Sequence, residues 1–61
     1  MTPQEAFEHY LETDEDTFLF TKGKKAVKVV FVCDSGEVYV PRLKRHFLVQ
    51  QFYDGWEAAA A

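Results

Sequence analysis

The sequence predicts an α+β domain in which a helix, a three-stranded antiparallel β-meander and a second helix follow one another (αβββα), with both helices on one face of the sheet. Two observations lead to this class. Apolar residues recur at helical spacing near both ends of the chain, and at every second position between residues 17 and 40. Turn-forming residues separate these segments. A chain of 61 residues has room for a single small domain, residues 1–61.

The first helix is predicted to begin at the N-terminus of the chain. Thr2 can act as the N-cap, Pro3 suits the first helical position, and Glu5 completes a capping box. The acidic run at residues 14–16 places like charges together and disfavours further helix. The apolar stripe of this helix is formed by Ala6, Phe7, Tyr10 and Leu11.

The first two strands are predicted to form a tight hairpin. Lys22-Gly23-Lys24-Lys25 matches a two-residue type II′ turn, in which Gly23 supplies the positive φ. This register places Phe20 opposite Val27, and the second strand is expected to run on to Cys33.

A second two-residue turn, at Ser35-Gly36, is predicted to lead into a third strand over residues 37–40. This turn places Cys33 opposite Val38 and Phe31 opposite Val40. One face of the sheet is then wholly apolar and should face the core, with Phe18, Phe20, Val27, Val29, Phe31, Cys33, Val38 and Val40. The other face is mixed, with Leu19, Thr21, Ala26, Lys28, Val30, Val32, Glu37 and Tyr39.

The second helix is predicted over residues 42–53, after Pro41 ends the third strand. Leu43, Phe47, Leu48 and Phe52 recur at helical spacing, and Asp54-Gly55 provides a terminator. Trp56 is expected to fold back onto the core or to remain as an exposed anchor. The closing run of alanines is interpreted either as a frayed helix end or as a vector-derived remnant.

No signature of catalysis or of metal binding is present, so we expect a protein that is not an enzyme, with no cofactor, no metal and no small-molecule substrate. The two histidines lie far apart in the sequence, and the single Cys33 is interpreted as a buried apolar residue. The acidic run at 14–16 lacks the glycine and the distal glutamate of a calcium loop. Without a signal peptide or a long apolar segment, we expect a soluble cytoplasmic protein that does not enter a membrane.

Charge is segregated along the chain. The first sixteen residues carry six acids and neither lysine nor arginine, whereas all seven lysines and arginines lie between Lys22 and Arg45. If the hairpin turn and the start of the predicted second helix lie side by side, the basic residues form an anion-binding ridge. The candidate contacts to an anion or to nucleic acid are Lys22, Lys24, Lys25, Arg42, Lys44 and Arg45.

Two functions of different class are compatible with these features. The favoured hypothesis is a small regulatory or inhibitory protein that docks on a protein partner or on a second copy of itself, as short accessory proteins of phages and mobile elements do. Its interface would be the mixed sheet face, with Leu19, Lys28, Val30, Val32 and Tyr39. The alternative is a nucleic-acid-binding module, because the predicted element order is also that of double-stranded RNA-binding domains. The acidic first helix departs from that analogy.

Overall fold

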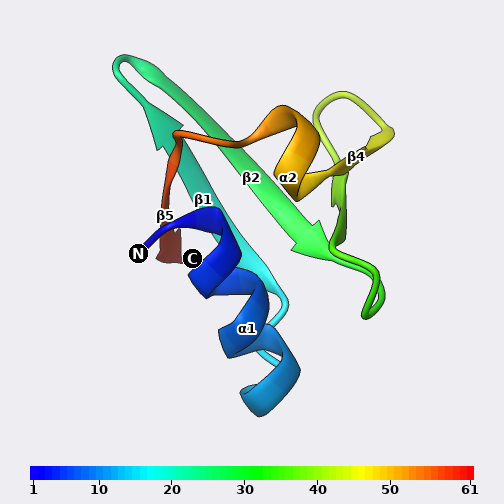
Figure 1. Ribbon diagram of the computed structural model, residues 1–61. Helices are drawn as coiled ribbons and strands as arrows, with labels where there is room; N and C mark the ends of the chain where they lie inside the picture. The colour runs from blue at the N-terminus through cyan, green and yellow to red at the C-terminus, as the bar shows by residue number, and fades with distance from the viewer.

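A computed structural model describes residues 1–61 and shows an α+β fold with a five-stranded antiparallel sheet and two helices (Figure 1). The fold class is therefore confirmed, whereas the three-stranded meander is wrong in detail. The sheet order is β4-β3-β2-β1-β5. The elements are α1 (Pro3–Thr13), β1 (Thr17–Lys22), β2 (Lys25–Phe31), β3 (Glu37–Val40), β4 (Arg45–Leu48), α2 (Val49–Phe52) and β5 (Glu57–Ala60).

Helix α1 begins as predicted, with both hydrogen bonds of the capping box. The Glu5 N–H donates to the Thr2 hydroxyl oxygen at 3.1 Å, and the Thr2 N–H donates to the Glu5 carboxylate at 2.8 Å. This backbone hydrogen bond from Thr2 holds the pKa of the Glu5 carboxyl below its usual value. The helix ends at Asp14, which adopts the left-handed conformation with φ 62°.

The β1–β2 hairpin also forms as predicted. Lys22 pairs with Lys25 across a two-residue turn, and Gly23 has φ 61° while Lys24 does not have a positive φ, as a type II′ turn requires. Phe20 lies opposite Val27 in this register.

The β2–β3 connection is longer than predicted, because strand pairing ends at Phe31. Phe31 lies opposite Val38 and not Val40, and the Val32 N–H donates to the Glu37 carbonyl at 3.3 Å. The shift from the predicted register is two residues, so the side chains within β2 and β3 keep their predicted faces. Cys33 is displaced from the strand into the turn, where its half-buried thiol sulfur lies 2.8 Å from the Ser35 hydroxyl oxygen.

The predicted helix over residues 42–53 is wrong, since only Val49–Phe52 is helical. The Val40 carbonyl accepts hydrogen bonds from the N–H groups of Leu43 and Lys44, and Lys44 adopts the left-handed conformation with φ 54°. A left-handed residue ends this first turn and reverses the chain. Strand β4 then pairs with β3 and provides hydrogen-bond partners for the backbone groups at the open edge of β3. This pairing places Phe47 opposite Val38 on the core face.

The alanine-rich C-terminus forms β5, so the frayed helix end is wrong. Strand β5 pairs with β1, and Ala58 is buried opposite Phe20. The backbone of Met1 exchanges two hydrogen bonds with Ala58, so the two ends of the chain lie side by side (Figure 1). Trp56 packs against the core, with its ring 5.1 Å from the ring of Tyr53.

The core lies between the sheet and the two helices, which pack on the same face of the sheet as predicted. From β1 to β3, the buried residues come from the face predicted to be apolar, and Ala6 joins them from α1. Val49 of α2 and Tyr53, the residue directly after α2, complete the buried core. With two further strands, the element order is no longer that of double-stranded RNA-binding domains, and this analogy is not retained.

Candidate interaction surfaces

The outer face of the sheet, opposite the helices, collects all five predicted interface residues. The strand registers place Leu19 opposite Lys28 on one row, and Val30 opposite Tyr39 on the next. Val32 follows Val30 by two residues and therefore lies on the same side of the sheet. We use "outer face" for the surface formed by Leu19, Lys28, Val30, Val32, Tyr39, His46 and Leu48.

The last two members of the outer face were missed by sequence reasoning. His46 lies opposite Tyr39, with the ring centroids 5.0 Å apart, and Leu48 lies opposite Glu37. The sequence predicts a helix here, because Arg45-His46-Phe47-Leu48 has two polar residues followed by two apolar ones and lacks the alternation of a strand. The signal that could have revealed them is Pro41 followed by a short polar segment, which suits a second hairpin turn as well as a helix start.

Neither helix covers the outer face. The aromatic contacts made by α1 are with Phe18 and Phe31, and Tyr53 after α2 contacts Phe20, all on the core face. On the outer face Leu19 is 38% exposed, Val32 43% and Leu48 45%, while Val30 and Tyr39 are half-buried. The outer face is therefore a mixed surface on which Lys28 and Glu37 accompany apolar side chains in contact with water, and exposed apolar side chains gathered in this way often mark an interaction site.

The six predicted anion-contact residues occupy two turns at the same end of the sheet. Lys22, Lys24 and Lys25 lie at the β1–β2 turn, whereas Arg42, Lys44 and Arg45 lie at or beside the β3–β4 turn. These two turns project apart from one another (Figure 1), because β2 extends beyond the residues that pair with β3. The sheet brings the basic residues to one end of the molecule without joining them into a single ridge.

None of the seven lysines and arginines is paired with a carboxylate. The one ion pair of the structure joins His9 on α1 and Glu15 in the loop that follows it at 3.3 Å, and this loop enters β1 at the end of the sheet opposite the basic turns. An acid does lie near the basic end, because Glu57 of β5 pairs with Thr21 beside Lys22. The acidic loop after α1 and the β2–β3 turn with Asp34 lie at the opposite end of the sheet.

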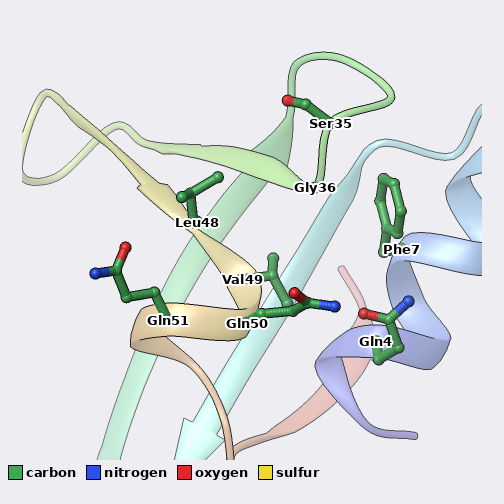
Figure 2. A pocket seen from close by; sticks show the side chains of 8 residues that line it. All are labelled: Gln4, Phe7, Ser35, Gly36, Leu48, Val49, Gln50 and Gln51. Atoms are coloured by element: carbon green, nitrogen blue, oxygen red, sulfur yellow. The ribbon is translucent and has the colours of Figure 1, made fainter.

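A groove of about 470 Å³ opens between α1, the β2–β3 turn and α2 (Figure 2). Phe7 and Val49 give it an apolar base, and the amides of Gln4 and Gln50 point toward one another across it (Figure 2). Ser35 and Gln51 also line it, and none of its lining residues is charged. The groove offers hydrogen-bonding amides without an acid or base to move a proton.

The remaining candidates for chemistry lie apart. His9 is on α1 and His46 on β4, while Cys33 lies in the β2–β3 turn. No group of three or more His, Cys, Asp or Glu side chains is arranged to hold a metal ion. Neither helix has the length and apolar character needed to cross a bilayer.

Comparison of the chain with protein-family models, with curated proteins and with solved structures gave no match.

Proposed function

We propose that this protein is a small regulatory or inhibitory adaptor that works by docking its outer face on a cytoplasmic protein partner. The observation that carries the proposal is the set of exposed apolar side chains on the outer face, which both helices leave uncovered. Burying exposed leucine and valine side chains contributes about 25 cal/mol per Å² of apolar surface removed from water. A docked partner would cover this face of the sheet, as the two helices cover the opposite face.

The charges beside the outer face favour a partner with an acidic surface. Lys28 belongs to the outer face itself, and Arg42 and Lys44 lie in the β3–β4 turn at its end. Arg45 instead lies opposite Val40 on the core face, with its guanidinium 5.7 Å from the centre of the Phe47 ring. Because Lys28, Arg42 and Lys44 have no intramolecular carboxylate partners, they can attract an acidic surface and accelerate its association. The apolar centre would provide most of the affinity, and the charged end would orient the partner.

The substitution Leu19→Asp tests the proposal. An aspartate at this position faces Lys28 across the strand pair, which reduces the cost of the change to folding. The matched control is Leu11→Asp, because Leu11 is 51% exposed on α1, away from the outer face. Both variants are expected to fold, as checked by circular dichroism.

The measurement is a pull-down from nuclease-treated lysate of the source cells with wild-type, Leu19→Asp and Leu11→Asp protein as bait. We expect a discrete acidic protein that wild type and Leu11→Asp retain at ~300 mM salt and that Leu19→Asp does not retain. Equal retention by Leu19→Asp would contradict docking through the outer face. A concentration-dependent dimer in sedimentation, abolished by Leu19→Asp, would identify a second copy as the partner.

The alternative function is nucleic-acid binding, favoured by the absence of carboxylate partners for the seven bases. The separation of the two basic turns and the presence of Glu57 at the same end both weaken it. In the same pull-down without nuclease, this alternative predicts nucleic acid that is captured at ~50 mM salt and released at ~300 mM. The double variant Lys24→Glu, Lys25→Glu would abolish that capture, whereas it would only slow docking on a protein.

A further inference from the structure

The two edges of the sheet differ in whether their backbone groups are covered. At the β5 edge, Ala58 exchanges two backbone hydrogen bonds with Met1, so the outward backbone groups of Ala58 are already satisfied by the chain's own first residue. At the other edge, β4 has no further strand beside it (Figure 1). An open edge offers unpaired N–H and C=O groups to an extended chain.

The ladder geometry identifies which groups of β4 point outward. The Val49 N–H donates to the Gly36 carbonyl at 3.0 Å, and bonded pairs alternate along an antiparallel ladder. Phe47 therefore bonds toward β3, whereas both backbone groups of His46 and the N–H of Leu48 point away from it. The Leu48 carbonyl accepts the first hydrogen bond of α2, because Leu48 is the N-cap of that helix. No backbone hydrogen bond outside the ladders and helices involves either residue.

Exposed apolar side chains surround this open edge. Leu43 is 54% exposed in the turn before β4, Leu48 ends the strand, and Phe52 of α2 is 53% exposed. The ring of Phe52 lies 4.9 Å from that of Phe47, on the core side of β4. A strand added beside β4 would therefore meet Leu48 with the side chains of one face and Phe47 and Phe52 with those of the other.

The positive charge of residues 41–53 indicates which kind of chain would pair with the β4 edge. Residues 41–53 contain Arg42, Lys44 and Arg45 and no acid, and none of the three is paired with a carboxylate. A second copy of β4 would bring the same three bases to the edge, and like charges across a strand pair are destabilising. An extended segment that carries carboxylates meets these bases with opposite charge.

We propose that the β4 edge binds an extended acidic segment of a protein partner by strand addition, with apolar side chains alternating along the segment. The N–H and C=O groups of His46 and the N–H of Leu48 supply the hydrogen bonds, and Arg42, Lys44 and Arg45 set the charge preference. This site is the backbone edge of β4, whereas docking on the outer face uses side chains such as Leu19, which lies on β1 away from this edge.

Leu48 allows the backbone contact to be removed selectively. Its φ of −83° is close to the value that proline imposes, and its N–H is not used by the ladder. Leu48→Pro therefore removes one outward N–H, while Leu48→Ala removes the side chain and retains the N–H. The comparison of these two variants isolates the hydrogen bond from the apolar contact.

The experiment selects binders from a displayed library of random peptides of about ten residues, longer than a typical strand of roughly five to six. We expect enriched peptides in which apolar residues alternate with aspartate or glutamate. A synthetic enriched peptide should bind Leu48→Pro about tenfold or more weakly than Leu48→Ala. Leu19→Asp should retain this binding, which separates the edge site from docking through the outer face.

Amide hydrogen exchange of the wild-type protein provides a readout that does not depend on the folding of any variant. The peptide should protect the amides of His46 and Leu48, whereas the Phe47 amide is already protected in the free protein. The proposal is overturned if no acidic alternating peptide is enriched, if Leu48→Pro binds as well as Leu48→Ala, or if these two amides remain unprotected. Protection that rises with protein concentration in the absence of peptide would identify a second copy and also overturn it.

Discussion

Phe31 is the residue on which the aromatic core converges. Four aromatic rings lie with their centroids 5.2 to 6.3 Å from its own, two from α1 and two from β1. Its side chain is 2% exposed, so nearly all of its surface is removed from water. The four neighbours are Phe7, Tyr10, Phe18 and Phe20.

We predict that Phe31→Ala leaves the protein largely unfolded. Removing a buried phenylalanine costs about 3–5 kcal/mol. A 61-residue domain has only ~0.05–0.15 kcal/mol of stability per residue, so the loss is comparable to the whole free energy of unfolding. The matched change Phe52→Ala, at a ring that is 53% exposed, should cost about 1 kcal/mol or less. Urea denaturation followed by circular dichroism measures both, and equal midpoints for the two variants would contradict this account of the core.

Tyr53 makes the stability of the protein sensitive to alkaline pH. Burial raises the pKa of the Tyr53 hydroxyl above its ordinary value of 10.0, because it disfavours the phenolate. Between pH 10.0 and the raised pKa, the unfolded chain releases a proton that the folded chain retains. The contribution of Tyr53 to the free energy of unfolding should therefore be constant below this range and fall as the pH rises through it.

Tyr53→Phe should reduce this alkaline loss, because phenylalanine has no proton to release. We expect the variant and the wild type to have similar denaturation midpoints at neutral pH and the variant to be the more stable above pH 10.0. Thermal unfolding at neutral pH and at high pH measures the difference. An identical loss in both proteins would assign the alkaline transition to another group.

At the scale of the elements, the C-terminus of α1 carries an unfavourable residue. Asp14 has φ 62°, a conformation that only glycine adopts without strain, and its negative charge lies at the negative end of the helix dipole. Asp14→Gly should raise the free energy of unfolding by about 0.5–1 kcal/mol. Asp14→Asn removes the charge alone and should recover only part of this gain in a urea titration. A destabilised Asp14→Gly variant would show that the carboxylate has a role that the helix end does not require.

Elements whose formation depends on local chemistry could be predicted from the sequence. The capping box determines the start of α1, and Gly23 determines the β1–β2 turn, because each uses residues a few positions apart. Strand β4 could not be predicted, because the same apolar residues fit a helix and a strand edge. Its formation depends on β3, whose open edge gains backbone partners when Lys44 turns the chain back.

At the scale of the whole molecule, the segregation of charge along the chain becomes a separation between the two ends of the sheet. The lysines and arginines lie at or near one end, and the acidic loop after α1 lies at the other. The acidic and basic groups thus face different regions of solvent, and only His9 and Glu15 form an ion pair. A partner that contacts the outer face near the β3–β4 turn therefore meets a net positive field.

The sequence by itself determined the α+β class, the first helix and hairpin, and the face of each residue in β1, β2 and β3, since alternation survives even a register shift of two residues. Only the tertiary structure decided that residues 45–48 and 57–60 are strands. Alanines such as Ala58 have little intrinsic preference for a strand. Ala58 is extended because β1 offers a partner strand and because a small side chain fits in the core opposite Phe20. Long-range pairing of this kind depends on a partner strand that local sequence does not specify, and it created the open β4 edge and the His46 and Leu48 part of the outer face.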